Sequence, residues 1–313
     1  MRIGTRGSAL ALTQARQIAG RLEATGLEVE LVVVRTSGDR LGDTPLARLG
    51  GKGLFIKELE ERLLEGAIDV AVHSMKDVPA ELAPGLAIGA VPPREAPHDV
   101  LVLPSGRARG GASVSEALAS GARVGTGSLR RGAQLAAMRP DWEIVPLRGN
   151  VDTRLRKLAA GEVDGVVLAA AGLARLGIDV PALPLDPDDF VPAPGQGALA
   201  IEVRQGDERI RAELARLHDE RAAAECAAER GLARALGASC VAPIGALARV
   251  EGPSAARIGI RGLVATPDGR RVLRRDASGA AADAAALGER LGRELLEAGA
   301  GEILAEAARQ AER

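Results

Sequence analysis

A strand–turn–helix pattern that occurs twice is the feature that most limits what this chain can fold into. Residues 2–9 read Arg-Ile-Gly-Thr-Arg-Gly-Ser-Ala, and residues 123–129 read Arg-Val-Gly-Thr-Gly-Ser-Leu. Residues 64–72 and 159–167 form a second pair of similar segments. Between these segments each half is predicted to run strand, helix, strand, helix, strand, which is typical of a parallel α/β sheet. The repetition predicts two similar α/β lobes. Chance similarity between two βα units is the alternative, because repeats this short are weak signals.

The first half shows this alternation most clearly. Ser8 is expected to cap a helix over 9–24. Five glycines between residues 36 and 53 predict a loop that is mobile or approaches a ligand closely. The other predicted elements are strands over 2–5, 27–34 and 68–72 and a helix over 54–65.

Two proline-rich segments are predicted to cross between the lobes. Residues 91–97 lead from lobe one to lobe two, and residues 181–194 lead back. Residues 198–203 then form a strand that is expected to rejoin lobe one. Two crossings between α/β lobes predict a hinged, bilobal architecture with a cleft. The expected boundaries are 1–92 with 198–217 for lobe one and 98–191 for lobe two.

A third, smaller α+β domain is predicted after Gly206, where the character of the sequence changes. Residues 207–236 are rich in Ala, Arg and Glu and are predicted to be almost wholly helical. Residues 281–308 are predicted to form a closing helix that breaks near 299–301. Between them lie strand-like runs over 241–250, 257–265 and 271–275. The domain is expected to span 220–313.

Composition excludes several classes of function. The chain has 313 residues and is 46% hydrophobic, which is enough for two or three domains with their own cores. A net charge of -1 and 1% aromatic residues argue against nucleic-acid binding. The start leads directly into a strand pattern and no apolar run could span a bilayer, so neither a signal peptide nor membrane binding is expected. The 3 His and 2 Cys show no metal-ligand spacing and suit a reduced cytoplasm.

Polar residues follow the predicted strand over 68–72. The run His73-Ser74-Met75-Lys76-Asp77 is costly to bury unless these residues are needed there. Ligands of open α/β sheets lie at the carboxyl ends of strands. Lys76 and Asp77 could therefore bind an anion and steer a proton in one site. The alternative is that Asp77 caps a turn before Pro79 and Lys76 is solvated, which is the commoner outcome for an arbitrary pair.

Basic residues gather near the two repeated turns. Each turn precedes a helix, whose free N–H groups and positive dipole end favour anions. If these cations line one cleft, its ligand carries many negative charges, and Arg suits carboxylates through its bidentate fork. Ordinary solvated helix faces are the alternative. The cations are Arg6, Lys52 and Lys76 in lobe one and Arg130, Arg131, Arg148, Arg154 and Arg175 in lobe two.

The two cysteines have different surroundings. Cys226 lies among alanines in a predicted helix and is interpreted as a small core residue. Cys240 lies in a predicted loop between a helix and a strand, where a thiol could act as a covalent anchor or nucleophile.

Several motifs, taken together and in order, resemble those of the porphobilinogen deaminase (hydroxymethylbilane synthase) family over essentially the full length. They are Gly-Gly-Lys-Gly-Leu-Phe at 50–55, His-Ser-Met-Lys-Asp-Val-Pro at 73–79, Gly-Thr-Gly-Ser-Leu-Arg-Arg at 125–131, Leu-Arg-Gly-Asn-Val at 147–151 with Thr-Arg-Leu at 153–155, Gly-Gln-Gly-Ala at 195–198, and the Cys240 loop. The family often has Lys where this chain has Arg48, and Gly before the cysteine where this chain has Ser239.

The resemblance implies a fold, a reaction and a cofactor. The fold would be two periplasmic-binding-protein-like lobes joined by a double hinge, plus the smaller C-terminal domain. The enzyme would be a transferase of tetrapyrrole biosynthesis that condenses four porphobilinogens head to tail into hydroxymethylbilane and releases ammonia. A dipyrromethane cofactor, made from the substrate, would be attached through Cys240. We expect a cytoplasmic monomer that needs no metal and hands its product to uroporphyrinogen-III synthase.

The resemblance also assigns roles to residues. Asp77 would be the catalytic carboxylate, which stabilises the cationic azafulvene left by ammonia loss and helps to move protons. Lys76 beside it favours the ionised carboxylate. The expected cofactor-binding residues are Lys76, Ser128, Arg130, Arg131, Arg148 and Arg154 beside Cys240, and the expected substrate-binding residues are Arg6, Ser8, Lys52, Phe55, Arg175 and Gln196.

A function from another class also fits a bilobal layout. Such a chain could bind an anionic solute or sense an effector without catalysis. The expected absence of a signal peptide, the third domain with its cysteine loop, and Asp77 argue against this alternative.

Overall fold

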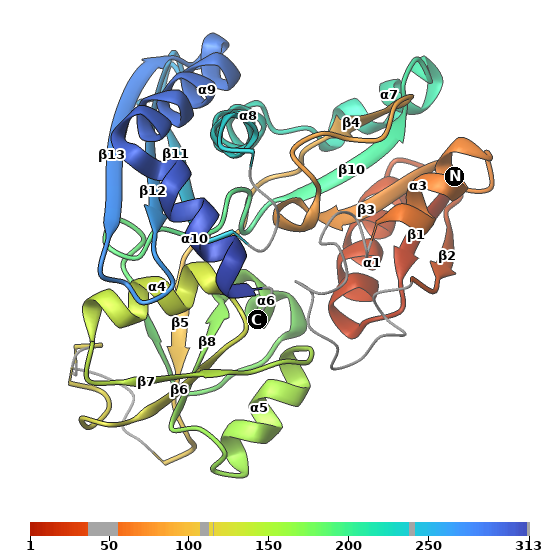
Figure 1. Cartoon of the computed structure of the whole chain (residues 1–313). Coiled ribbons are helices and arrows are strands. Elements are labelled where there is room, and N and C mark those ends of the chain that lie inside the picture. The colour runs from red at the N-terminus through yellow and green to blue at the C-terminus, as the bar shows by residue number, and fades with distance from the viewer. Residues whose placement is uncertain (37–55, 107–112, 115, 238–241, 312–313) are drawn as a thin grey trace.

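The structure is a computed structural model that describes residues 1–36, 56–106, 113–114, 116–237 and 242–311. Figure 1 shows lobe one on the right, lobe two at the lower left and the C-terminal domain at the upper left. Lys52, Phe55 and Cys240 lie outside the described residues. The same is true of Arg48, Ser239 and nearly all of the predicted loop over 36–53.

Lobe one is a five-stranded sheet with a core on each face. Its strand order is β2-β1-β3-β10-β4. Strand β1 pairs in parallel with β2 and β3, whereas β10 is antiparallel to both β3 and β4. One face packs on α1 and α7 and the other on α3, because apolar side chains alternate along the strands. The elements are β1 (Arg2–Arg6), α1 (Ala9–Glu23), β2 (Glu30–Val34), α3 (Lys57–Leu64), β3 (Val70–Ser74), β4 (Leu86–Ala90), β10 (Leu199–Arg204) and α7 (Glu208–Leu214).

Lobe two repeats this arrangement. Its strand order is β7-β6-β8-β5-β9, with β6 parallel to β7 and β8 and with β5 antiparallel to β8 and β9. Each strand therefore has a counterpart in lobe one, and the predicted similarity of the two lobes is confirmed. The elements are β5 (Asp99–Val102), β6 (Arg123–Thr126), α4 (Leu129–Met138), β7 (Glu143–Pro146), α5 (Val151–Ala159), β8 (Gly165–Ala169), α6 (Ala170–Leu176) and β9 (Ala182–Pro184).

The two crossings between the lobes lie against each other. The N–H of Glu95 donates to the carbonyl of Gly197 at 3.2 Å. Gly197 has a φ of +89°, and a Cβ there would come within 2.3 Å of the Glu95 carbonyl oxygen. Only glycine suits this position, because other residues avoid positive φ and would collide with the first crossing. The proline-rich way back predicted over 181–194 begins with edge strand β9 of lobe two.

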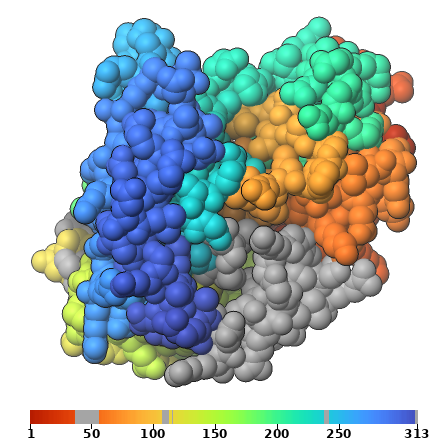
Figure 2. Space-filling view, turned by 45° about the horizontal axis from the view of Figure 1, so that its top comes forward, coloured from red at the N-terminus to blue at the C-terminus, as the bar shows by residue number. Residues whose placement is uncertain are grey.

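The C-terminal domain is a three-stranded antiparallel sheet with helices on one face. Its strand order is β11-β12-β13, and α8, α9 and α10 pack on the sheet in one core. Figure 2 shows α8 between this domain and lobe one. The predicted break in the closing helix is confirmed, because Gly299 has a φ of 98°. The elements are α8 (Glu220–Ala235), β11 (Ile244–Glu251), β12 (Arg257–Ala265), β13 (Val272–Ala280), α9 (Ala284–Leu295) and α10 (Gly301–Ala311).

The predicted fold class, two similar α/β lobes plus a smaller α+β domain, is confirmed, but several predicted bounds are wrong. The strand predicted over 68–72 runs over Val70–Ser74, and the strand predicted from residue 27 begins at Glu30. The strand predicted over 271–275 runs to Ala280. Its second half, Asp-Ala-Ser-Gly-Ala, has low strand propensity and is held by pairing along β12.

Candidate active site between the lobes

The carboxyl end of β3 turns directly into a short 3₁₀ helix, η2 (Met75–Asp77). Met75 is buried and anchors this turn in a core shared with Cys226 of α8. On the same side, Arg230 of α8 donates to the carbonyls of Val78 and Ala80 at 3.3 and 3.1 Å. The turn leaves Asp77 exposed. The predicted place of Asp77 at the end of this strand is confirmed, and its catalytic role stays a prediction.

A buried carboxylate organises the cations at the start of α4. Asp99, the first residue of β5, is fully buried. Its Oδ1 accepts from Nε and Nη2 of Arg131 at 3.0 and 2.7 Å. Its Oδ2 lies 2.8 Å from Nη1 of Arg130. The two guanidinium groups outweigh the cost of burial and hold the pKa of Asp99 well below its usual range.

Lys76 is linked to this cluster through Gln196, which is almost wholly buried. The Lys76 ammonium donates to Oε1 of Gln196 at 3.3 Å, and Nε2 of Gln196 donates to Oδ1 of Asp99 at 2.9 Å. Desolvation, reinforced by the positive charge of Arg131, lowers the pKa of Lys76 to about 8. Asp77 and Asp99 oppose this shift.

Arg154 adds another cation close to Arg131. Its Nε donates to the carbonyl of Gly149 at 2.8 Å. Desolvation, followed by repulsion from Arg131, lowers the pKa of Arg154 to about 10. Gly127 lies beside it, where an added Cβ would come within 2.9 Å of the Leu147 carbonyl oxygen. Ser128 caps α4, since its hydroxyl accepts from the Arg131 N–H at 3.4 Å.

The other predicted site residues that the structure describes lie at or next to the ends of strands and helices. Ser8 caps α1, and its hydroxyl accepts from the Ala11 N–H at 3.3 Å. Arg6 ends β1 and Arg148 follows β7, and both side chains are partly buried. Arg175 of α6 donates from Nη2 to the carbonyl of Gly197 at 2.7 Å, so it contacts the second crossing. Burial lowers the pKa of Arg175, and Glu95 opposes the shift.

Hydrogen bonds and an ion pair thus join Lys76, Arg130 and Arg131 in one cluster through Asp99 and Gln196. Arg154 interacts with the edge of this cluster. Sequence reasoning missed Asp99, although a carboxylate that begins the apolar run Val-Leu-Val at 100–102 is a usable signal. Gln196 was predicted to bind substrate. In the structure its amide bonds to Lys76, Asp99 and the Pro97 carbonyl.

A second buried ion pair, also missed, joins the crossings to the C-terminal domain. Arg94 of the first crossing binds Glu229 of α8 through two hydrogen bonds of 2.8 and 3.0 Å. Glu229 also accepts from the N–H groups of Gly195 at 2.6 Å and Ala248 at 2.8 Å. One carboxylate therefore ties both crossings to α8 and β11.

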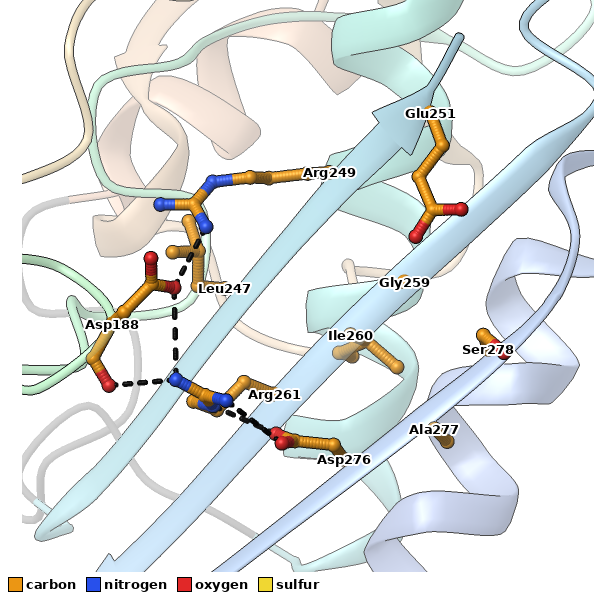
Figure 3. A pocket seen from close by; sticks show the side chains of 10 residues that line it. All are labelled: Asp188, Leu247, Arg249, Glu251, Gly259, Ile260, Arg261, Asp276, Ala277 and Ser278. Carbon is orange, nitrogen blue, oxygen red and sulfur yellow. Dashed lines mark hydrogen bonds and ion pairs between the residues drawn. The ribbon is translucent and has the colours of Figure 1, made fainter.

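A pocket of about 410 Å³ lies elsewhere, on the face of the C-terminal sheet that α8 does not cover (Figure 3). Four of its five charged side chains already pair with one another. Asp188 binds Arg249 at 2.7 Å, and Arg261 binds Asp276 at 2.7 Å. Because Asp188 belongs to the second crossing, these pairs connect the crossing to the sheet. They do not leave a cluster of like charge for an anionic ligand.

The cluster around Asp99 fits a polycarboxylate such as dipyrromethane. The positive charges of Arg131 and Arg130 add to desolvation in lowering the pKa of Lys76, and the charge of Arg131 adds to desolvation in lowering the pKa of Arg154, with Asp99 as the buried counter-charge. An added carboxylate would relieve this repulsion. In the part of the chain that the structure describes, no group of three or more His, Cys, Asp or Glu side chains could hold a metal ion. None of the described helices is long and apolar enough to cross a membrane.

Two solved structures that match this chain show distant similarity. An ancestral cationic amino acid solute binding protein has 15% identity and a TM-score of 0.42, covering 69% of this chain and 87% of that chain. The Bordetella pertussis BvgS VFT2 domain has 17% identity and a TM-score of 0.41, covering 68% and 84%. Similarity at this level carries no argument about ligand or function.

Comparison with protein families and named relatives gives much closer matches. The family described as porphobilinogen deaminase, dipyromethane cofactor binding domain, matches residues 1–212, and the porphobilinogen deaminase C-terminal domain matches 223–297. A porphobilinogen deaminase of Syntrophus aciditrophicus is 51% identical over 309 residues, covering 98% of each chain. One of Moorella thermoacetica is 49% identical over 309 residues, covering 98% of this chain and 96% of the relative. These matches do not favour a non-catalytic binding module, and the chain belongs to the porphobilinogen deaminase family.

Proposed function

We propose that this chain is a hydroxymethylbilane synthase whose active site lies at the carboxyl ends of β3 and β6. It condenses four porphobilinogens into hydroxymethylbilane with release of ammonia. The observation that supports this site is the crowding of Lys76, Arg131 and Arg154, with Asp77 directly after Lys76 on the same turn. Each porphobilinogen carries an acetate and a propionate, so its binding needs several cations. When bound, dipyrromethane supplies the pyrrole carbon that attacks the activated substrate and anchors the growing chain.

Asp77 acts as the catalytic carboxylate. As ammonia leaves, positive charge develops on the substrate pyrrole, and a nearby carboxylate stabilises that charge. Its exposed place at the end of a buried strand leaves it open to substrate while the Met75 anchor fixes its backbone. Asp77 also takes up the proton that the attacking ring carbon releases and returns it to the next leaving amine.

The basic residues divide between cofactor and substrate. Arg131 and Arg154, with Lys76, Ser128, Arg130 and Arg148, hold the dipyrromethane carboxylates. Arg6 and Ser8, at the carboxyl end of β1, bind the incoming substrate or the growing chain, with Lys52, Phe55, Arg175 and Gln196. Arg forms the stronger, bidentate contact to carboxylate, and helix starts such as those of α1 and α4 add N–H groups.

Several finer assignments are also proposals. The domain boundaries are 1–92 with 198–217, 98–191, and 220–313. The enzyme acts as a cytoplasmic monomer and hands its product to uroporphyrinogen-III synthase. The free, buried thiol of Cys226 is compatible with a reducing compartment.

Mass spectrometry of the purified protein tests the proposal. We expect an adduct of two pyrrole rings on Cys240, mapped by peptide analysis. Cys240→Ser should lack the adduct and be inactive, because a serine oxygen is a much poorer nucleophile than a thiolate. Cys226→Ser is the matched control and should keep the adduct, since Cys226 is buried and desolvation raises its thiol pKa to about 12. An active enzyme with unmodified Cys240, or with the adduct on Cys226, would contradict the proposal.

A further inference from the structure

We propose that Asp99 is a positioning residue for the cofactor site, holding two adjacent arginines and, through the Gln196 amide, fixing Lys76 across the boundary between the lobes. This inference rests on the proposed function. Asp99 does not touch substrate in this scheme. It acts through the side chains that do.

The geometry gives Asp99 more than one partner to place. Both of its oxygens face guanidinium groups, with Oδ1 taking two bonds from Arg131 and Oδ2 lying against Arg130. The remaining contacts of the arginines fix them from other sides. Arg131 donates from Nη1 to the Val167 carbonyl at 3.0 Å, and Arg130 donates from Nη1 to the Val191 carbonyl at 2.8 Å. Each guanidinium thus has one defined orientation.

The Gln196 side-chain amide connects Asp99 to Lys76 of lobe one by hydrogen bonds. Its Nε2 donates to Asp99 and to the Pro97 carbonyl at 2.7 Å, which orients the amide. Its Oε1 is thereby turned towards the Lys76 ammonium. Lys76 lies in lobe one, Asp99 in lobe two, and Gln196 in the second crossing, so the chain of bonds spans all three.

A purely structural ion pair is the competing explanation, and charge argues against it. Buried ion pairs often add little to stability relative to apolar replacements. Here one buried carboxylate serves two buried arginines and a half-buried lysine, so the cluster keeps an excess of positive charge even after pairing. That excess suits a site that takes up carboxylates.

The primary test compares Asp99→Asn with Asp164→Asn as the matched control. Asp164 stands just before strand β8 of lobe two and accepts from the Arg123 N–H at 2.8 Å, with a partly exposed side chain. Intact mass measures the fraction of purified protein that carries dipyrromethane. We expect Asp99→Asn to lower that fraction about tenfold, as loss of partners that orient ligating side chains does elsewhere, with a parent-like near-ultraviolet circular dichroism spectrum. Asp164→Asn should load like the parent. Equal loading of Asp99→Asn and the parent would overturn the proposal.

A second readout separates positioning from mere stability. Apo-protein is loaded with porphobilinogen at a series of pH values, and the rate of adduct formation is followed by mass. The charges that face Lys76 are Asp77 on its own turn, Arg130 and Arg131 on α4, and Asp99 on β5. The loading rate should fall at alkaline pH, where Lys76 loses its proton. Without the negative charge of Asp99, this fall should occur at a pH about one unit lower. An unchanged position of that fall would oppose the proposal.

Gln196→Met keeps the test decisive if Asp99→Asn does not fold. It cuts the link to Lys76 but leaves the pairing of Asp99 with its arginines. We expect the alkaline fall to move in the same direction, because the Lys76 ammonium loses its acceptor. Parent-like loading and pH dependence of this variant would overturn the proposal. Absence of the adduct from the parent itself would overturn both this inference and the proposed function, whereas equal adduct on parent and Asp99→Asn overturns this inference alone.

Discussion

Replacing Arg94 should destabilise the whole junction between the crossings and the C-terminal domain. Arg94→Met removes the charge but keeps most of the apolar stem. Arg94 makes two bonds to Glu229 at 2.8 and 3.0 Å, one to Glu225 at 3.3 Å, and one to the Gln196 carbonyl at 3.0 Å. Charged hydrogen bonds contribute about 1.5–3 kcal/mol each, but these act on one group and do not add. Breaking a buried pair from one side costs about 3–5 kcal/mol, and we expect a loss in that range near neutral pH.

The loss of unfolding free energy caused by Arg94→Met should increase as pH rises. Burial raises the pKa of Glu229 above its ordinary value of 4.5, and Arg94 opposes that rise. Without Arg94 the folded-state pKa rises further, while the unfolded-state pKa does not change. A group with a raised folded-state pKa favours folding when protonated, and this stability is lost as pH rises through the folded pKa. The variant should therefore approach parent stability below about pH 4.5 and fall away from it as pH rises.

Urea denaturation, followed by far-ultraviolet circular dichroism and by the fluorescence of Trp142 in lobe two, measures the effect. Arg249→Met is the control, because Arg249 pairs with Asp188 at 2.7 Å with both side chains about half exposed. Such a surface pair is worth about 0–1 kcal/mol. The double variant Arg94→Met with Glu229→Met should cost less than Arg94→Met alone, because no unpaired buried charge remains. A loss below about 1 kcal/mol for Arg94→Met, or a loss that does not vary with pH, would refute this reasoning.

Two further predictions concern the reaction. Asp77→Asn should slow single-turnover ammonia release from cofactor-loaded enzyme about 100-fold or more, because asparagine keeps the shape of the side chain but removes the negative charge that stabilises the substrate cation. Release at the parent rate would mean that Asp77 is only a turn residue. Activity should also fall as pH rises through about 8, because the desolvated Lys76 ammonium then loses its proton and its attraction for carboxylates. Lys76→Arg should move this fall to higher pH, and a pH profile identical to the parent would show that Lys76 does not set it.

Much of the fold could be predicted from the sequence, because the sequence features that indicate it act locally. Apolar runs, the Ser8 and Ser128 caps and the proline-rich crossings each act within a few residues of the structure they specify. The buried ion pairs were missed for the opposite reason. Asp99 meets Arg131 across 32 positions of sequence, and Arg94 meets Glu229 across 135. Nothing near a charged residue in the sequence shows that a distant partner will make its burial tolerable.

For the candidate site residues, the sequence indicated which side chains gather in the site better than it indicated which groups those side chains contact. Lys76, Arg130 and Arg131 do lie in one cluster, but much of their hydrogen bonding goes to protein groups such as Asp99 and the Gln196 amide. His73 shows the same limit. It stands in the predicted polar run, yet its ring pairs with Glu202 at 3.0 Å inside lobe one, on the neighbouring strand β10.

During chain synthesis, the strands of the lobe two sheet are all made before the last strand of the lobe one sheet, although lobe one begins first in the sequence. Lobe two draws all five strands from one continuous segment, β5 to β9, so its sheet can close as soon as that segment has emerged. Lobe one cannot, because β10 is inserted between β3 and β4 and is made only after the whole of lobe two. Until then β3 and β4 present unpaired edges, which are prone to pair with other chains. We therefore expect the N-terminal lobe to be the last of the two to fold on the ribosome. A pause in translation before β10 should lengthen the time for which the edges of β3 and β4 stay unpaired.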